Sequence, residues 1–171
     1  MPNPPFRRLN YFTGRLLTAD DFQLEQSYHI EHRKLHNRMI HGWGVVSGLD
    51  VSTSGSDVHV SPGLALDCEG NEVLVHSEIV SPIGQQTSTS LFVALAYTEK
   101  LINPSPIAGD FNDVEEGADL QLLTTNSNEC HRHSRGRWLS CGKKHAVTIA
   151  RLRKTAMGWR VDRRYRPPIV K

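Results

Sequence analysis

The sequence of 171 residues has no long hydrophobic run, few cysteines and little net charge. A membrane-spanning helix needs about 20 consecutive apolar residues, and no stretch approaches that length, so we expect no membrane span. Three cysteines, an odd number, argue against the disulfide framework of a small secreted domain. A formal net charge of +2 gives no reason to expect nucleic-acid binding.

Sequence motifs of common enzyme classes are also absent. The chain lacks GxSxG, GxxxxGK(S/T) and GxGxxG, and it offers no pair of carboxylates in a context that suggests tuned pKa values. We therefore expect a protein that is not an enzyme and that has no resident cofactor. The opening MPNPPFRRLNYFTGRLL carries prolines and arginines where a signal peptide needs an apolar stretch, so we expect synthesis and assembly in the cytoplasm.

Residues 1–17 are predicted to form an extended arm, because three prolines near the start disfavour a helix. The arm interleaves aromatic with basic side chains, among them Phe6, Arg7, Arg8, Tyr11 and Phe12. Aromatic side chains in such number are costly to leave in water. We therefore expect the arm to lie against its own domain or against a neighbouring subunit.

Residues 18–41 are predicted to form a docking helix. Thr18 is a strong N-cap residue, and Asp21 occupies the position from which an acidic side chain completes a capping box. Gly42 and Gly44 supply the stop. A stripe of apolar residues is expected to face the domain core, and it consists of Leu24, Tyr28, Leu35 and Met39.

Residues 42–171 are predicted to form a single β-rich domain. Short alternating segments up to about residue 77, separated by glycine and proline turns, indicate a β-meander. Further along, we expect strands over 90–101 and 119–125, loops over 103–118 (acidic) and 126–143, and a closing hairpin turning near 156–158. The predicted class is α+β, mostly β, with an antiparallel β-sandwich or barrel-like domain.

The segment HIEHRKLHNRMIHGWG concentrates histidines on the predicted helix. His32 and His36 have the spacing of two ligands on one metal ion, with His29 on the same face, but no general base lies between them. Phe22, His29, His36 and Trp43 also form a heptad stripe, which is typical of a partly wet helix interface. We favour packing and hydrogen bonding for these imidazoles over a metal site or a catalytic role.

A second cluster of cysteines and histidines lies in CHRHSRGRWLSCGKKH, and comprises Cys130, His131, His133, Cys141 and His145. Two cysteines and two histidines would suit a tetrahedral zinc site, although the spacing matches no zinc finger. A disulfide between Cys130 and Cys141 and an exposed polar loop with two thiols are the alternatives. The segment is also basic, and the acidic loop of this or an adjacent copy is its simplest counterpart.

Two long segments, RLNYFTGRLLTADDFQLEQSYHIEHRKLHNRMIHGWGVVSGLDV and VHVSPGLALDCEGNEVLV, resemble a bacterial family associated with gene clusters for phage-tail-like contractile injection systems. The resemblance covers about residues 8–76. The second segment is also similar to β-domains of phage tail fibres and baseplate parts. The resemblance implies a structural component of a tail-like particle and not a catalyst.

These observations predict a structural or adaptor subunit that acts in a baseplate, at a fibre attachment or in a collar. Its partners would be other subunits of the particle and further copies of itself, with a trimer suggested by analogy to fibres. The particle would be assembled in the cytoplasm, and release to the outside is an open alternative. The expected interface comprises Phe6, Arg7, Arg8, Tyr11, Phe12, Phe22, His29, His36 and Trp43. The alternative function is a zinc-stapled β-sandwich module that binds a carbohydrate or an acidic ligand.

Overall fold

The computed structural model describes residues 6–107, 109–128 and 146–170. Within these ranges, a helix and one further helical turn are followed by ten β-strands in antiparallel sheets. The predicted class, α+β and mostly β, is confirmed. No helix among the described residues is long and apolar enough to cross a membrane.

Helix α1 (Ala19–His36) continues into a single π-helical turn, η1 (Asn37–His41). The predicted capping box is present, because the Thr18 hydroxyl accepts from the backbone N–H of Asp21 and the Asp21 carboxylate accepts from the backbone N–H of Thr18. The turn ends at Gly42, whose φ of +78° glycine adopts without steric cost. The predicted start and stop of the helical segment are therefore both confirmed.

Ten strands follow the helix. The short ones are β1 (Gly44–Gly48), β2 (Val51–Ser54), β3 (Asp57–Val60), β4 (Gly63–Leu66), β5 (Glu72–Val75) and β6 (Ile79–Pro82). The remaining ones are β7 (Ser90–Pro104), β8 (Phe111–Leu123), β9 (Val147–Thr155) and β10 (Gly158–Val161). Strands β9 and β10 pair as the predicted closing hairpin.

The strands form three sheets with the orders β1-β4-β5, β2-β3-β6 and β10-β9-β7-β8. The expected simple meander of the first strands is wrong, since β1 pairs with β4 and β2 pairs with β3 in a different sheet. The physical reason lies between β1 and β2. Gly48 and Leu49 both have positive φ, near +60°, and these two residues redirect the chain out of the first sheet.

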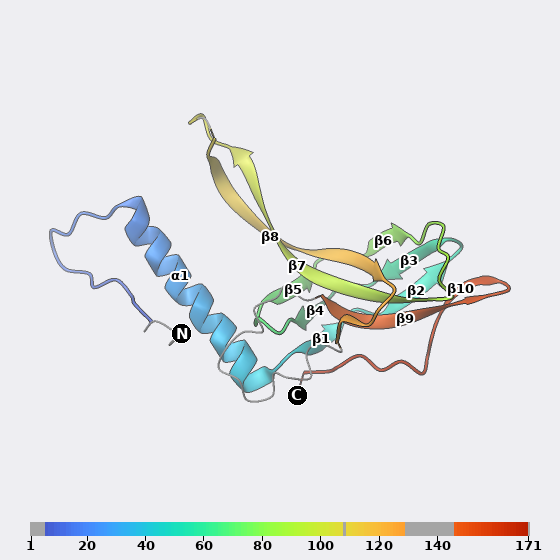
Figure 1. The fold of residues 1–171 in the computed structure, drawn as a ribbon. Helices are drawn as coiled ribbons and strands as arrows, with labels where there is room; N and C mark the ends of the chain where they lie inside the picture. The colour runs from blue at the N-terminus through green and yellow to red at the C-terminus, as the bar shows by residue number, and fades with distance from the viewer. Residues whose placement is uncertain (1–5, 108, 129–145, 171) are drawn as a thin grey trace.

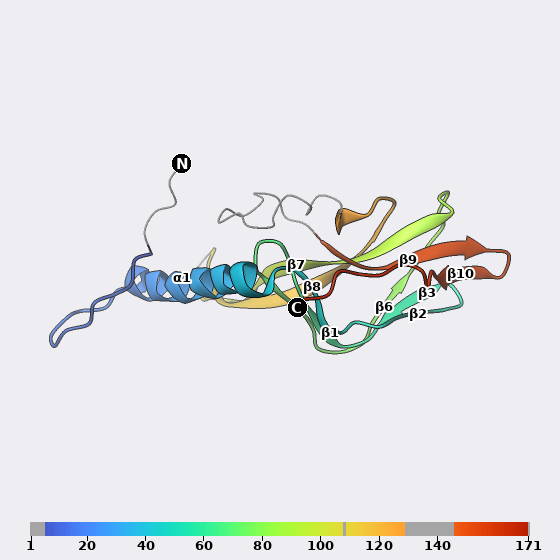
Figure 2. The same cartoon turned by 90° about the horizontal axis from the view of Figure 1, so that it is seen from below.

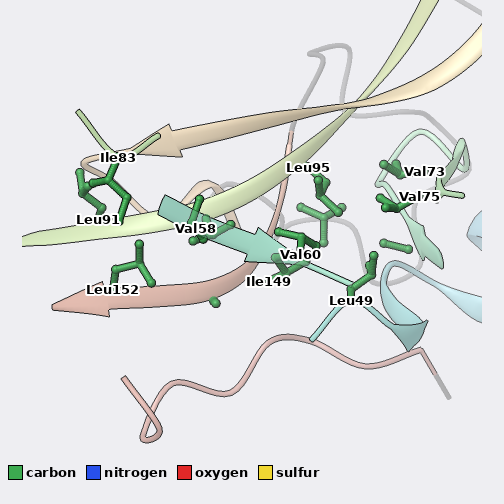
Figure 3. Close-up of a cluster of buried hydrophobic side chains, with 14 residues drawn as sticks. Leu49, Val58, Val60, Val73, Val75, Ile83, Leu91, Leu95, Ile149 and Leu152 are labelled. Atoms are coloured by element: carbon green, nitrogen blue, oxygen red, sulfur yellow. The ribbon is translucent and has the colours of Figure 1, made fainter. Parts of the chain in front are cut away.

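The hydrophobic core lies between the four-stranded sheet and the two smaller sheets (Figure 3). Strand β3 contributes Val58 and Val60, β7 contributes Leu91 and Leu95, and β9 contributes Leu152, all of them inaccessible to solvent. Alternate residues of these strands point to the same side, as expected for sheets with one buried face. One core therefore joins strands from the whole length of the β-rich domain.

Strands β7 and β8 continue beyond the core as a hairpin that projects from the sheets (Figure 1). The predicted acidic loop over 103–118 is therefore wrong, because the pairing runs out to Pro104 opposite Phe111. The proline and glycine signals of a loop belong only to the tip between these two residues. Both faces of the outer hairpin are open to solvent, so its sequence lacks the alternation that identifies a half-buried strand.

Helix α1 also projects from the sheets, as the two views in Figures 1 and 2 show. The apolar stripe predicted to face the core does not do so. No residue of α1 is buried, Leu24 and Leu35 are only half-buried, and Met39 in the following turn is exposed. The helix meets the sheets only at its C-terminal end, so its outer turns have no sheet surface to cover.

The last described residues return to the junction between helix and sheet. Val45 of β1 donates its N–H to the carbonyl of Pro168 at 2.8 Å and accepts from the N–H of Val170 at 2.9 Å. A Cβ on Gly44 would lie 2.6 Å from that Pro168 carbonyl oxygen, so only glycine fits between β1 and this segment. The C-terminal end of the described chain therefore lies beside β1, near the base of α1.

Candidate interaction surface

The base of α1 is fixed to the turn between β4 and β5. The buried amide of Asn37 donates to the carbonyl of Gly70 at 3.0 Å, and the guanidinium of Arg38 donates to the carbonyl of Glu69 at 2.7 Å. Arg33 adds an ion pair to Glu72 at 3.8 Å. Because these contacts come from successive turns of the helical segment, they set the direction in which the helix leaves the body.

Gly70 is required at this junction for steric reasons. Its φ is +86°, and a Cβ at this position would lie 2.3 Å from the carbonyl oxygen of Lys34. No side chain fits at that distance, so the turn and the last turn of α1 pack backbone to backbone. The sequence EGNE predicts only a tight hairpin loop. In the structure this loop is also the contact site of the C-terminal end of α1, which we call the seat of the helix.

The turn is itself organised by a buried carboxylate. Asp67 accepts hydrogen bonds from the backbone N–H groups of Glu69 and Asn71, each at 2.9 Å, and from the Asn71 side-chain amide at 2.8 Å. Burial raises the pKa of the Asp67 carboxyl above its usual range, although these hydrogen bonds act in the opposite direction. The neighbouring Cys68 is buried.

The arm turns back onto α1, and its first described residues contact the helix. The ring centroid of Phe6 lies 4.1 Å from that of His32, and the Tyr28 ring centroid lies 4.5 Å from it, both in tilted contacts. Leu9 is buried, whereas Phe12, farther along the arm, remains 63% exposed. The arm is thus held at Phe6 and Leu9 and presents most of its predicted interface, Arg7, Arg8, Tyr11 and Phe12, to solvent.

The connection between arm and helix is held by an ion pair. Arg15 meets the carboxylate of Asp21 at 2.7 Å and donates to the carbonyl of Asn10 at 2.9 Å. The backbone N–H of Thr18, and then the Arg15 guanidinium, lower the pKa of the Asp21 carboxyl below its usual range. The capping box therefore also orients the arm relative to the helix axis.

The structure places the predicted helix residues on an open surface. Phe22 is 56% exposed, and His29 lies at the surface with its Nε2 3.2 Å from a Glu25 carboxylate oxygen. His36 stacks on His41, with ring centroids 5.1 Å apart, and Trp43 is half-buried at the junction with the sheets. The outer part of the heptad stripe, Phe22 and His29, is therefore open to solvent.

Metal binding by the helix histidines finds no support among residues 6–107, 109–128 and 146–170, which contain no group of three or more potential ligands close enough to share an ion. His32 is stacked between two aromatic rings, in a packing role. The second candidate cluster, Cys130, His131, His133, Cys141 and His145, lies outside the described residues. Its zinc, disulfide and polar-loop alternatives stay predictions.

The arm and the outer helix both carry exposed apolar side chains, and we call this exposed part of the chain the arm–helix surface. Its exposed apolar side chains are Phe6, Tyr11, Phe12, Leu16, Phe22 and Ile30. Aromatic and arginine side chains of this kind are enriched at the centres of protein interfaces. The arrangement is suited to binding another protein.

The fold is similar to that of type VI secretion baseplate proteins. A chain of the baseplate complex from the type VI secretion system matches with a TM-score of 0.58 and 16% identity, over 96% of this chain and 60% of that chain. A chain of the TssK-TssF-TssG baseplate subcomplex also gives 0.58 and 16%, over 96% of this chain and 62% of that chain. The crystal structure of TssK gives 0.59 and 13%, over 96% and 42%.

These matches are a likeness of fold that extends over nearly the whole described chain. The chain spans less than two thirds of the length of each of these three proteins. No family model matches the sequence, and no curated protein matches it. The three matched structures carry titles of baseplate assemblies or of a baseplate component.

Sequence reasoning missed a second group of exposed apolar residues, on the projecting β7–β8 hairpin. The group consists of Leu101, Ile107, Phe111 and Val114. A usable signal was present, because Pro104, Pro106 and Gly109 confine the turn to a few residues between two segments of similar length. The acidic residues around them concealed it, since acidic composition is typical of loops.

Proposed function

We propose that the chain is a structural adaptor subunit of a phage-tail-like contractile particle and that it acts in the baseplate. Its fold resembles that of baseplate proteins over 96% of its length. The sequence resemblance to a family of contractile injection gene clusters, over about residues 8–76, points the same way. Its partners would be other subunits of the particle, together with further copies of itself.

The single observation that carries this proposal is the exposed arm–helix surface on an element that projects from a well-packed domain. A helix of 18 residues without one buried side chain gains little stability from its own domain. Apolar residues of the arm, such as Phe12 and Leu16, also lie outside the core. Burial against a partner gives these side chains the stabilisation that folding of the single chain does not provide.

The mechanism is assembly by burial, without a chemical step. The junction at Asn37, Arg38 and Gly70 holds the helix in one direction, so the surface reaches a partner in a defined orientation. The particle is assembled in the cytoplasm from these oriented contacts. We propose no catalytic residue, and the exposed imidazoles of His29 and His36 contribute polar contacts at the rim of the interface.

The proposal is tested by isolating contractile particles from cells that produce the full-length chain and quantifying their subunits by mass spectrometry. We expect the wild-type chain at a fixed ratio to the other particle proteins. Replacing Phe12 and Leu16 by alanine should weaken incorporation, because each lost apolar contact costs about 2 kcal/mol, or roughly thirtyfold in affinity.

A matched control removes exposed apolar side chains far from the arm, with Val80→Ala and Met157→Ala, and should incorporate like the wild type. Absence of the wild-type chain from isolated particles would overturn the proposed function. Equal incorporation of the arm variant and of the control would overturn the role of the arm–helix surface within it.

A further inference from the structure

The outer part of the β7–β8 hairpin carries an apolar pair between carboxylates. Leu101 pairs with Val114, and Glu99 pairs with Glu116, in the antiparallel register. Side chains of directly opposed residues, and of residues two apart on one strand, share a face. These four side chains therefore form one surface, the hairpin face, on which Leu101 is 62% and Val114 58% exposed.

The hairpin face lies on the side of α1. Glu116 forms an ion pair with Arg33 of the helix at 3.7 Å. This contact shows that the hairpin face is the one directed toward α1. In Figure 1 α1 and the hairpin leave the sheets at different points and run in similar directions, and in Figure 2 they overlap, so the two projections lie side by side in one plane. A segment that binds the hairpin face is therefore placed beside the helix.

The negative charge of the hairpin face is only partly balanced by cations of the described residues. Glu99 and Glu116 are opposite each other, and two like charges in that position repel. The Tyr97 hydroxyl donates to Glu99 at 2.8 Å, and burial together with these two carboxylates raises the pKa of Tyr97, so the hydroxyl keeps its proton. Arg33 is the one cation within ion-pair distance of these two glutamates among the described residues.

Charge and hydrophobicity on the arm complement those on the hairpin. Residues 99–117 contain five acidic residues and one lysine, whereas residues 6–17 contain three arginines and no acidic residue. Arg15 is paired with Asp21, but Arg7 and Arg8 have no carboxylate within ion-pair distance in the part of the chain that the structure describes. Both segments are extended and both expose apolar side chains.

The arm of the same chain does not occupy this face. Its start is held on its own helix by the stacking of Phe6 on His32. Among the described residues, no hydrogen bond, ion pair or ring contact joins the arm to the hairpin. A second copy of the chain carries a segment of the required length, charge and aromatic content, and this selects it as the occupant.

We propose that the arm of one copy, residues 6–17, docks on the hairpin face of a second copy, with Arg7 and Arg8 meeting the carboxylates and the arm aromatics covering Leu101 and Val114. The inference rests on the proposed function, in that it names one partner of an assembling subunit. The contact joins two different surfaces, so repetition of it closes a ring or extends a chain of copies. The outer helix stays available for other subunits.

The test is the oligomeric state of the purified full-length chain, measured by light scattering during size-exclusion chromatography over a range of protein concentrations. The wild type should self-associate, and more weakly at high salt. Arg7→Glu with Arg8→Glu should raise the dissociation constant about tenfold or more, and Glu99→Lys with Glu116→Lys should do the same.

The decisive samples are an equimolar mixture of these two variants and a chain that carries all four substitutions, because each restores opposite charges across the contact. Self-association should return in both. Arg160→Glu with Arg163→Glu, at exposed positions at the far end of the domain, is the matched control and should behave like the wild type. Circular dichroism of every variant shows whether it is folded.

A monomeric wild type would overturn the inference, as would unchanged association of either charge variant or failure of the mixture to restore it. Failure here is distinguishable from failure of the proposed function. A monomeric chain that is still found in isolated particles refutes the copy-to-copy contact alone. A self-associating chain that is absent from particles refutes the particle role alone.

Discussion

Asp67 stabilises the β4–β5 turn by accepting hydrogen bonds within it, and replacing Asp67 tests that role directly. Asp67→Ala leaves the N–H groups of Glu69 and Asn71 without their acceptor. We expect the free energy of unfolding to fall by about 2 kcal/mol, measured by urea unfolding. The exposed Asp50→Ala is the control, expected within about 0.5 kcal/mol of the wild type. Equal losses would show that the turn does not need this carboxylate.

The raised pKa of Asp67 also predicts a pH dependence. The folded state binds this proton more tightly than the unfolded chain, whose pKa is 3.8. The stabilisation is therefore complete below that value and is lost as pH rises through the folded pKa. Asp67→Asn keeps an acceptor oxygen and has no proton to lose, and rotation of the Asn71 amide accommodates the new NH₂ group.

We accordingly expect the wild type to lose stability relative to Asp67→Asn as the pH is raised from about 3.5 to about 7. The measurement is the difference between the two free energies of unfolding across this range. The contribution of Asp21, whose pKa is lowered, has the opposite sign and cancels in the difference, because both proteins contain it. A difference independent of pH would contradict the prediction.

The cluster of Cys130, His131, His133, Cys141 and His145 gives a separate prediction for metal content. If two cysteines and two histidines hold zinc, protein purified without a histidine tag contains one zinc per chain, and Cys130→Ser loses it. Elemental analysis of the two proteins measures this. The buried Cys68→Ser is the control for loss of a thiol elsewhere and should keep the metal. Metal-free wild-type protein would end the zinc alternative.

Among the elements, those with local chemistry were predictable from the sequence, and those defined by tertiary position were not. Thr18, Asp21 and Gly42 mark the helical segment through contacts within a few residues, and the closing hairpin was equally clear. The outer β7–β8 hairpin was missed because it has no buried face to impose alternation. The stripe through Leu24 and Leu35 was misplaced because periodicity does not show whether a sheet lies opposite.

The candidate surface was predictable in composition but not in extent. The aromatic and basic side chains of the arm, Phe6 to Phe12, could be named as interface residues from the sequence. Several aromatic side chains in one extended segment are unfavourable in water whatever the fold of the rest. The seat of the helix on Gly70 and the approach of Glu116 to Arg33 bring together residues more than 30 positions apart. No local pattern encodes those distances.

The junction between α1 and the sheets gives a prediction for an element as a whole. Gly70→Ala places a Cβ against the Lys34 carbonyl and should lower the free energy of unfolding by about 2 kcal/mol or more, with faster amide exchange in η1. Gly55→Ala, also at positive φ but in open space, is the matched control and should cost about 1 kcal/mol. Hydrogen exchange and urea unfolding measure both.

Equal costs for the two glycine variants would mean that the close approach of turn and helix does not hold in solution. Asn37→Ala tests the same seat from the side of the helix. It removes the donor to the Gly70 carbonyl and should also speed exchange in η1, without the steric conflict. Agreement between the two variants would establish that the contact between the turn and the helix stabilises η1.

The whole molecule combines a well-packed sheet domain with two projections, the arm and α1 on one side and the β7–β8 hairpin beside them (Figure 1). The core draws on residues from β2–β3 to β9, so the sheets should unfold together. The helix shares none of its side chains with that core. Its amides should therefore open locally, at a lower free energy than the sheets.

This difference predicts how a core substitution spreads through the molecule. Leu152→Ala removes a fully buried side chain of β9 and should cost about 3 kcal/mol. Amides of β7 and β9 exchange only when the sheets unfold, so their protection should fall by roughly two orders of magnitude. Amides in the outer turns of α1 exchange by local opening and should keep their exchange rates. The control Leu16→Ala, at an exposed residue, should likewise leave the exchange rates of these amides unchanged. Parallel loss of protection in α1 would mean that the helix opens only with the sheets, and that the projection is a rigid part of the domain even before a partner binds.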